Sequence, residues 1–160
     1  MGATALSNRA NWQMGARIVG DAGENDFAFL LAKELPEHYI VQHKPKKLIV
    51  YGDGKGIKLD TLVTNSITNK NLFIENKTGN NGGNAHERVY KFLAPGLKRV
   101  VRERYNTVDQ PFFMVFSGKT FQGKKYKDEI SLLLEEENHA IMDPDNGNIR
   151  NVAQQIMEIV

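Results

Sequence analysis

Two neighbouring segments of this chain combine carboxylates and a lysine at a spacing that suits metal-assisted hydrolysis. Asp60 lies in one predicted strand, and Glu75 and Lys77 lie two residues apart in the next. Because side chains alternate along a strand, Glu75 and Lys77 share one face. Two carboxylates can hold a hard divalent cation through oxygen. A lysine on the same face could meet an attacking water or the scissile phosphate, so the pattern favours phosphodiester hydrolysis.

This pattern is weak when it is taken alone. The alternative is that Asp60 and Glu75 are polar residues on half-exposed strands and that Lys77 ends a strand. The order of the predicted elements favours the catalytic interpretation, since one turn, residues 66–71, separates the two strands. A hairpin of this kind would bring both carboxylates to one end of a sheet.

A polar run that follows the second strand carries side chains able to recognise bases. It reads Gly83-Asn84-Ala85-His86-Glu87-Arg88 and begins six residues after Lys77. The asparagine amide can pair with the edge of adenine, and the arginine fork can reach base acceptors. The alternative is an ordinary helix start, because asparagine is also a good N-cap. Cutting chemistry next to base-reading chemistry indicates a sequence-specific DNA nuclease.

Basic side chains gather in two further stretches of the chain. The formal net charge of +2 is too small to indicate a nucleic-acid partner by itself, but the distribution is more informative. Clusters of this kind are typical of a surface that contacts a phosphate backbone, although a solvated helix face would look similar. The clusters comprise Arg88, Lys91, Lys98, Arg99, Arg102 and Arg104, and then Lys119, Lys124, Lys125 and Lys127.

The composition is that of one soluble globular domain, which we expect to span residues 1–160. The chain is 41% hydrophobic and 25% charged, and it is too short for two ordinary domains. No apolar run approaches the length of a membrane span, so no membrane partner is expected. The first residues lack the apolar stretch of a signal peptide, and cysteine is absent. These features fit a cytoplasmic protein.

The predicted helices and strands alternate along the chain. Apolar periodicity predicts helices over residues 21–35, 84–93, 97–105, 126–137 and 149–159, with residues 5–19 partly helical. It predicts strands over residues 39–41, 48–51, 57–63, 72–77, 111–116 and 140–142. Interleaving of this kind predicts an α/β fold, with a central mixed β-sheet flanked by helices.

At these residues the chain resembles type II restriction endonucleases of the PD-(D/E)XK superfamily, in the branch of EcoRI and MunI, and it is most similar to the MunI members. The resemblance covers nearly the whole chain, and the run from Gly83 to Arg88 is its most specific part. Leu59 stands where the family often has proline, and Asn76 stands where an apolar spacer is usual. The similar segments are residues 6–13, 44–46, 60, 75–77, 83–88, 95–97 and 111–118.

The resemblance implies a role for each residue of the catalytic pattern. Asp60, Glu75 and the main-chain carbonyl of Asn76 would bind magnesium (Mg²⁺). Lys77 would orient the attacking water and help to deprotonate it. Glu24 matches the position at which superfamily members often place an auxiliary acid, and the fold implied is the PD-(D/E)XK nuclease fold.

The resemblance also implies how DNA would be recognised. Asn84 and Arg88 would read the two adenines of a half-site, Glu87 would bridge them, and His86 would lie nearby. A palindrome read in this way requires a homodimer on double-stranded DNA. The expected site contains AATT, with 5′ overhangs after cleavage and a cognate methyltransferase that acts on the same site. Relatives that read six base pairs carry an arginine where this chain has Gly82, which predicts AATT alone or AATT with relaxed flanks.

Two other functions stay open on the residues. The same fold could belong to a DNA-repair or junction-resolving nuclease, which would cut by DNA structure instead of by sequence. A DNA-binding module without catalysis would bind tightly and show no cleavage in magnesium.

Overall fold

A six-stranded mixed sheet forms the centre of the protein. The computed structural model describes residues 15–79 and 85–160, and for residues 85–88 the backbone alone. The strand order is β1-β2-β5-β6-β7-β8. The pairs β2–β5 and β5–β6 are antiparallel, and the pairs β1–β2, β6–β7 and β7–β8 are parallel. The strands are β1 (Arg17–Val19), β2 (Tyr39–His43), β5 (Thr61–Asn65), β6 (Lys70–Thr78), β7 (Thr107–Ser117) and β8 (Asn138–Ile141).

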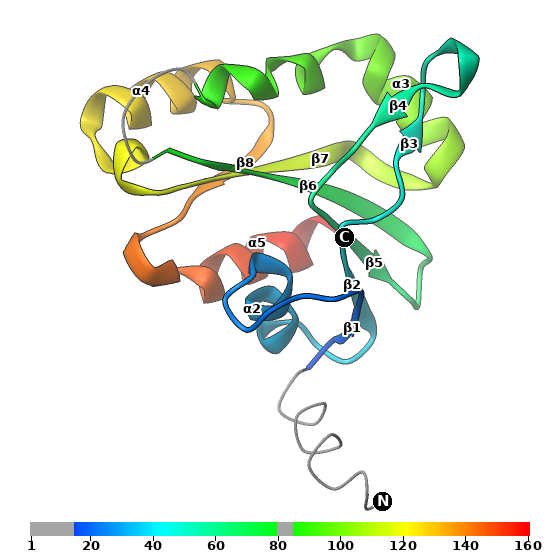
Figure 1. Cartoon of the computed structure of the whole chain (residues 1–160), viewed down its shortest axis with the longest axis horizontal. Coiled ribbons are helices and arrows are strands. Elements are labelled where there is room, and N and C mark those ends of the chain that lie inside the picture. Colours follow the sequence, from blue (N-terminus) through cyan, green and yellow to red (C-terminus); the bar gives the residue numbers. More distant parts are fainter. Residues whose placement is uncertain (1–14, 80–84) are drawn as a thin grey trace, which may run out of the picture.

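Helices cover both faces of this sheet, which makes a three-layer α/β structure (Figure 1). One face packs against α2 (Phe27–Glu34) and α5 (Ile149–Ile159) around a core that includes Val63, Ile74 and Val115. The other face packs against two 3₁₀ helices, η2 (Ala85–Leu93) and η3 (Lys119–Gln122), and against α3 (Pro95–Tyr105) and α4 (Lys124–Leu133). The predicted fold class is confirmed, while the prediction of a single domain over residues 1–160 stays a prediction.

The helix and strand lengths differ from the predictions at several ends. Helix α2 begins at Phe27 and not at residue 21, because residues 20–26 form a loop in which the Asp26 carboxylate accepts a hydrogen bond from the Gly23 N–H at 2.6 Å. Residues 17–19, in a segment predicted to be partly helical, form strand β1. Helix α4 ends at Leu133, and strand β8 begins at Asn138. No helix within residues 15–79 and 85–160 is long and apolar enough to cross a membrane.

A separate hairpin, residues 44–58, leaves the sheet between β2 and β5, and we call it the β3–β4 arm. It contains β3 (Leu48–Ile49), a short 3₁₀ turn (Gly52–Gly54) and β4 (Gly56–Ile57). The sequence predicted one continuous strand over residues 57–63, and this prediction is wrong. Residues 56–57 pair with Leu48 and Ile49 inside the arm, whereas Thr61 begins a strand of the main sheet.

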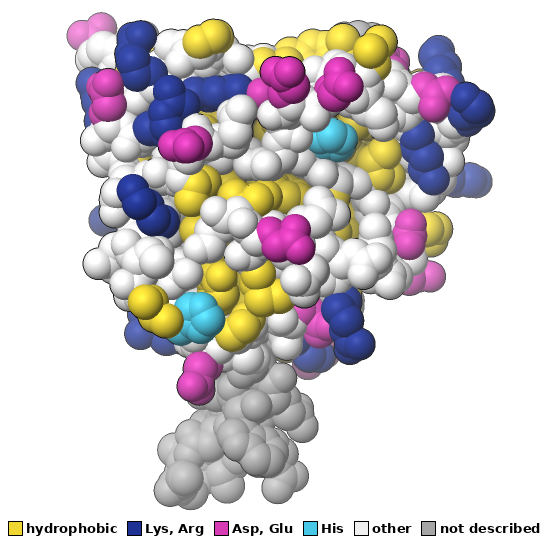
Figure 2. Space-filling view, turned by 180° about the vertical axis from the view of Figure 1, so that it is seen from behind, with side chains coloured by type: hydrophobic (Ala, Val, Ile, Leu, Met, Phe, Trp, Pro, Cys, Tyr) yellow, Lys and Arg dark blue, Asp and Glu magenta, His cyan; other side chains and the backbone are white. Residues whose placement is uncertain are grey.

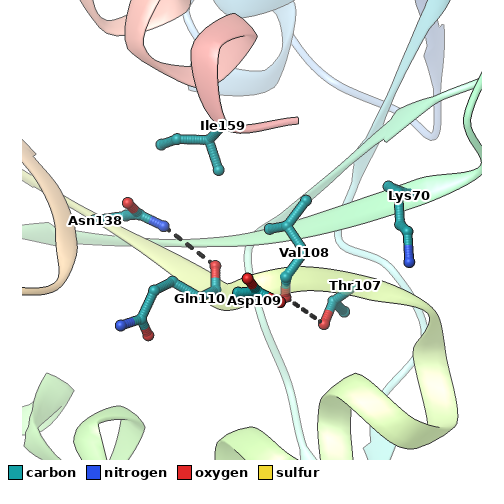
Figure 3. Close-up of a pocket in the computed structure, with 7 residues that line it drawn as sticks. All are labelled: Lys70, Thr107, Val108, Asp109, Gln110, Asn138 and Ile159. Atoms are coloured by element: carbon teal, nitrogen blue, oxygen red, sulfur yellow. Dashed lines mark hydrogen bonds between the residues drawn. The ribbon is translucent and has the colours of Figure 1, made fainter.

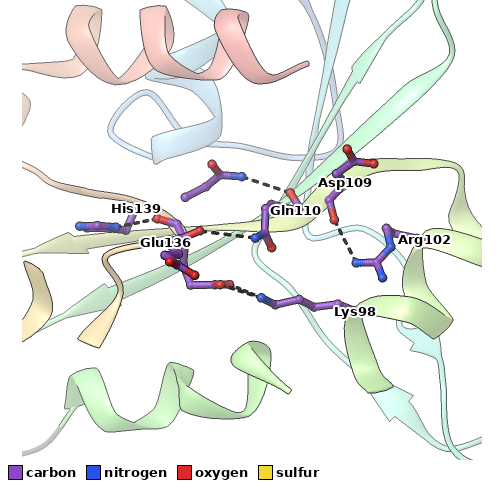
Figure 4. A network of polar contacts seen from close by, with 8 residues as sticks. Lys98, Arg102, Asp109, Gln110, Glu136 and His139 are labelled. Atoms are coloured by element: carbon purple, nitrogen blue, oxygen red, sulfur yellow. Dashed lines mark hydrogen bonds and ion pairs between the residues drawn. The ribbon is translucent and has the colours of Figure 1, made fainter. Parts of the chain in front are cut away.

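A buried ion pair fixes α3 against the segment that enters β8 (Figure 4). Lys98 Nζ lies 2.7 Å from one carboxylate oxygen of Glu137 and 2.5 Å from the other, and both side chains are nearly buried. Gln110 and Asn138 continue the network, since the Asn138 side-chain amide donates to the Gln110 carbonyl at 3.1 Å. The network therefore holds the helix that follows η2 in a fixed position on the sheet.

Candidate active site and DNA-contacting surface

Asp60 and Glu75 meet across the first rung of the β5–β6 hairpin. Thr61 pairs with Ile74 in this antiparallel ladder, and continuing the register by one residue sets Asp60 opposite Glu75. The Asp60 Oδ2 accepts a hydrogen bond from the Asn76 N–H at 2.7 Å. On its other side, the Asp60 carbonyl accepts a hydrogen bond from the Lys44 N–H at 2.8 Å. The first acid is thus held by both neighbouring strands, as the predicted hairpin requires.

Glu75 and Lys77 form a close ion pair on one face of β6. Lys77 Nζ lies 3.0 Å from Glu75 Oε2, and Glu75 is only 8% exposed. Burial raises the pKa of the Glu75 carboxyl above its ordinary value, and the nearby charge of Asp60 raises it further, although the hydrogen bond from Lys77 opposes both. A buried carboxylate beside a second carboxylate is costly to ionise unless a cation compensates for it. This is the electrostatic environment that favours cation binding.

The donor set fits a hard divalent cation. Asp60 and Glu75 supply carboxylate oxygens, which are the ligands that Mg²⁺ prefers. In an extended strand the N–H and C=O of one residue point toward the same neighbouring strand. Because the Asn76 N–H points toward Asp60, the Asn76 carbonyl faces that side too, as the predicted third ligand must. The Asn76 side chain projects to the opposite face, where its Oδ1 is buried without a hydrogen-bond partner.

The structure does not bring Glu24 to these acids. Glu24 is exposed in the loop before α2. Across the described residues, no three acidic or histidine side chains lie close enough together to hold a metal ion. An open cavity of about 440 Å³ lies at the opposite end of the strands, where β6, β7 and β8 begin, and it is lined by residues such as Lys70 and Asp109 (Figure 3). That cavity is therefore separate from Asp60 and Glu75.

The run predicted to read bases lies mostly outside the described residues. Gly83 and Asn84 fall outside the described residues, and Ala85, His86, Glu87 and Arg88 form the start of η2 with undescribed side chains. Further along η2, Val89 and Phe92 are fully buried against the sheet face that carries Phe73. By strand alternation Glu75 and Lys77 share that face. The first turn of η2 is thus held on the face of the sheet that carries Glu75 and Lys77.

Four lysines of the predicted basic clusters lie on the same side of the sheet, but they differ in their surroundings. Lys91 is exposed on η2, with its ammonium 5.2 Å from the centre of the Phe92 ring. Lys119 is exposed on η3, which follows β7. The Thr120 N–H of η3 donates a hydrogen bond to the carbonyl of Gly79, the residue after β6. Lys124 forms an ion pair with Asp128, which raises the pKa of Lys124, and the Lys125 ammonium lies 5.5 Å from the centre of the Tyr126 ring.

The lysines of the β3–β4 arm were not among the predicted site residues. In the sequence, residues 44–47 separate the predicted strands 39–41 and 48–51. The available signal was the density of lysine between His43 and Asp60 with one acid among them. The structure shows that this segment leaves and rejoins the sheet directly beside Asp60.

Comparisons with known proteins agree on one family. The family model described as type II restriction enzyme MunI matches residues 49–152, which is more than half of the chain. The type II restriction enzyme MunI of Mycoplasma sp is 29% identical over 167 residues, covering 82% of this chain and 83% of that enzyme. The crystal structure of MunI restriction endonuclease in complex with cognate DNA superposes with a TM-score of 0.68 at 22% identity, covering 98% of this chain and 92% of that one.

The structural match by itself establishes the shared fold. The family match runs from the last residue of β3 to the first turn of α5, and so it includes Asp60, Glu75, Lys77 and η2. Together with the paired acids of the β5–β6 hairpin, these matches identify the chain as a site-specific deoxyribonuclease that belongs to the MunI family of type II restriction enzymes.

Proposed function

We propose that this protein is a magnesium-dependent homodimer that cuts both strands of DNA within a palindrome containing AATT. The observation that carries this proposal is the position of Asp60 opposite Glu75, with Lys77 3.0 Å from Glu75 on the same strand. No other pair of acids in the described residues combines burial, a neighbouring lysine and a strand carbonyl on the same side.

Asp60, Glu75 and the Asn76 carbonyl are the residues that would hold the magnesium ion. When bound, the ion supplies positive charge that stabilises the phosphorane-like transition state and lowers the pKa of a coordinated water. The chain prepares this site in advance, because the Asn76 N–H fixes the Asp60 carboxylate and burial keeps Glu75 away from bulk water. The acids therefore need little rearrangement to bind a cation.

Lys77 would act on the nucleophile and the phosphate. Its ammonium is paired with Glu75 and is partly exposed, with 21% of the side chain accessible. Three N–H donors leave it free to keep this contact while it donates to an attacking water or to a non-bridging phosphate oxygen. The lysine thereby aligns the water with the scissile phosphorus, and alignment of this kind contributes to the rate by removing orientational freedom.

The base-reading role rests on the run from Gly83 to Arg88. MunI restriction endonuclease is described in complex with cognate DNA. Carrying this property to the present chain, Asn84 and Arg88 read the adenines of AATT from the start of η2, with Glu87 between them. Reading a palindrome requires two copies of the chain related by a two-fold axis. Gly82 offers no side chain to an outer guanine, which supports a site of AATT with relaxed flanks and 5′ overhangs.

Digestion of a sequenced viral DNA with the purified protein tests this proposal. In the presence of magnesium we expect fragment ends that map to AATT, and with EDTA we expect no cleavage. Lys77→Ala and Glu75→Ala should abolish cleavage while duplex binding survives, because both residues act on the transition state and not on the bases. Ends that show one invariant base pair on each side of AATT would refute the relaxed-flank assignment.

A competition binding assay separates the reading residues from the cutting residues. Asn84→Ala and Arg88→Ala should each lower the preference for AATT, since a good bidentate contact provides roughly 1–3 kcal/mol of discrimination. Lys124→Ala is the matched control, because a phosphate contact would weaken binding to every sequence equally. Unchanged preference in both variants of the η2 run would show that bases are read elsewhere.

A further inference from the structure

Positive charge is concentrated on the β3–β4 arm. Residues 44–58 contain five lysines and one acid, Asp53, which gives the arm a formal charge of +4. The whole chain carries +2, so the remaining residues together carry −2. In Figure 2 the Lys and Arg side chains crowd the corner that the arm and α3 occupy. The arm is therefore a third concentration of positive charge, beside the basic clusters within residues 88–104 and 119–127.

The arm lysines have no acidic partner among the residues that the structure describes. Lys44, Lys46, Lys47, Lys55 and Lys58 are all exposed, and none of them forms an ion pair with a described residue. By contrast, the basic residues Lys98, Lys124 and Arg150 each pair with a carboxylate. Unpaired ammonium groups on a rigid hairpin are available to an external polyanion.

The two ends of the arm lie at the end of the sheet that carries Asp60 and Glu75. His43 pairs with Thr61, and the next rung joins the Lys44 N–H to the Asp60 carbonyl at 2.8 Å. The buried side chains of the arm, such as Leu48 and Ile57, pack in the same core as η2 and α3. The arm thus lies on the face that carries Glu75 and projects beyond α3, on the side of the molecule opposite α4 (Figure 1).

Helix α3 holds the arm rigidly. The Ile49 N–H donates to the Tyr105 hydroxyl at 2.7 Å, and the Arg104 guanidinium donates to the Ile49 carbonyl at 2.7 Å. Both backbone polar groups of this edge residue are therefore satisfied by α3. Within the arm, a Cβ placed on Gly56 would lie 1.6 Å from the Leu48 carbonyl oxygen, so the two strands approach more closely than a side chain allows.

A groove separates the arm from the helices beside it. It has a volume of about 480 Å³, and its walls include Val50 and Tyr51 from the arm and Lys91 and Arg99 from η2 and α3. Tyr51 is 52% exposed. Two cations on the helix wall, facing an aromatic ring on the arm wall, suit a sugar–phosphate backbone, since phosphates can meet the cations while the sugar meets the ring.

We propose that the β3–β4 arm is a second DNA-contacting element, in which Lys46, Lys47 and Lys55 hold the phosphate backbone of the duplex outside the recognised bases, with Lys91 and Arg99 on the facing wall. This inference rests on the proposed function for the identity of the polyanion. The arm lies on the far side of α3 from α4, so the contacts extend the footprint along the duplex without reading its sequence.

The test measures how binding depends on salt for two lengths of DNA. The full-length protein is assayed by fluorescence anisotropy in EDTA with an AATT duplex of about 10 base pairs, one helical turn, and with another of about 30. The test variant combines Lys46→Gln, Lys47→Gln and Lys55→Gln. The matched control removes the same charge from distant positions, by Lys33→Gln, Lys70→Gln and Arg150→Gln.

On the long duplex we expect the salt dependence of the arm variant to flatten by about 2.7 in log K against log salt for each protomer, because each lost phosphate contact contributes about 0.9. The short duplex should bind the arm variant and wild type with the same slope, and the control should match wild type on both. Replacing the three lysines by arginine should restore the slope. The ends produced by cleavage should be the same for all variants.

Two results separate the arm from the nuclease. If the wild-type protein cuts at AATT and the arm variant keeps the long-duplex slope of the control, the arm assignment is overturned and the endonuclease stands. If the wild-type protein cuts no DNA but the arm variant still loses slope relative to the control, the arm assignment stands and the proposed cleavage falls. Wild-type protein that binds neither duplex would overturn both.

Discussion

Replacing Asn76 by valine should stabilise the protein without affecting cleavage. Asn76 lies between Glu75 and Lys77, but its side chain projects to the other face of the sheet, beside the fully buried Ile74 and Val115. Its Oδ1 is buried and accepts no hydrogen bond. The proposed metal ligand at this position is the main-chain carbonyl, which valine keeps. Asn76→Val therefore separates the contribution of the side chain from that of the backbone.

The size of the effect follows from the unpaired oxygen. A buried acceptor that loses its water contacts and gains none in return costs about 1–3 kcal/mol. Valine also has a higher preference for strands than asparagine, on a scale that spans about 1 kcal/mol. We expect the free energy of unfolding to rise by about 1–3 kcal/mol. For a chain of this length the melting temperature should rise by about 2–4 °C for each kcal/mol.

Urea unfolding and a cleavage assay measure the two effects separately. Gln42→Val is the matched control, because Gln42 lies in strand β2 of the same sheet and has no buried unpaired atom. The stability gain of Asn76→Val should exceed that of the control, and the rate of cleavage should equal that of wild type. A large loss of cleavage with normal folding would show that the Asn76 amide takes part in the chemistry, against the backbone-ligand assignment.

Three further perturbations test other features of the structure. Burial raises the pKa of Glu75 in the folded protein. Without metal, the contribution of this carboxyl to stability is therefore complete below the ordinary pKa of 4.5, and it is lost as pH rises through the higher folded pKa. Glu75→Gln should therefore gain stability relative to wild type across that rise in EDTA, and magnesium should no longer raise its melting temperature. Lys98→Met should cost about 3–5 kcal/mol in urea unfolding, because Glu137 is left buried without a partner, and adding Glu137→Leu should restore most of it. Gly56→Ala should separate the two strands of the arm at Leu48 and should expose the arm to limited proteolysis, whereas an arm that stays resistant would contradict the close approach.

The β5–β6 hairpin could be predicted from the sequence because its signals are local. Two short apolar runs, Leu62-Val63 and Leu72-Phe73-Ile74, are separated by a polar stretch, and one short turn joins the two strands. In a two-stranded antiparallel pair the turn sets the register, and the register sets which residues are opposite. The observed turn, residues 66–69, is two residues shorter than the predicted turn, residues 66–71. The sequence thus predicted the hairpin, and the structure sets the register in which Asp60 lies opposite Glu75.

The break before this hairpin could not be predicted in the same way. Ile57, Leu59, Thr61 and Val63 are all buried and are spaced two residues apart, so the alternation continues through the break. Periodicity reports which face of a strand is buried but not which strand it pairs with. Residues 56–57 pair within the arm, whereas Val63 pairs with β2 and β6 in the main sheet. The partner is decided by tertiary packing.

The arm is joined to the sheet at a single rung, and this has a consequence for how such proteins diversify. One backbone hydrogen bond joins Lys44 to Asp60, so the pairing that positions Asp60 does not depend on how many residues lie between them. Lengthening a closed loop costs little, about 0.6 kcal/mol for each doubling of its length. Insertions, deletions or whole grafted hairpins between these two residues can thus alter how much substrate is covered while the geometry of hydrolysis is inherited unchanged.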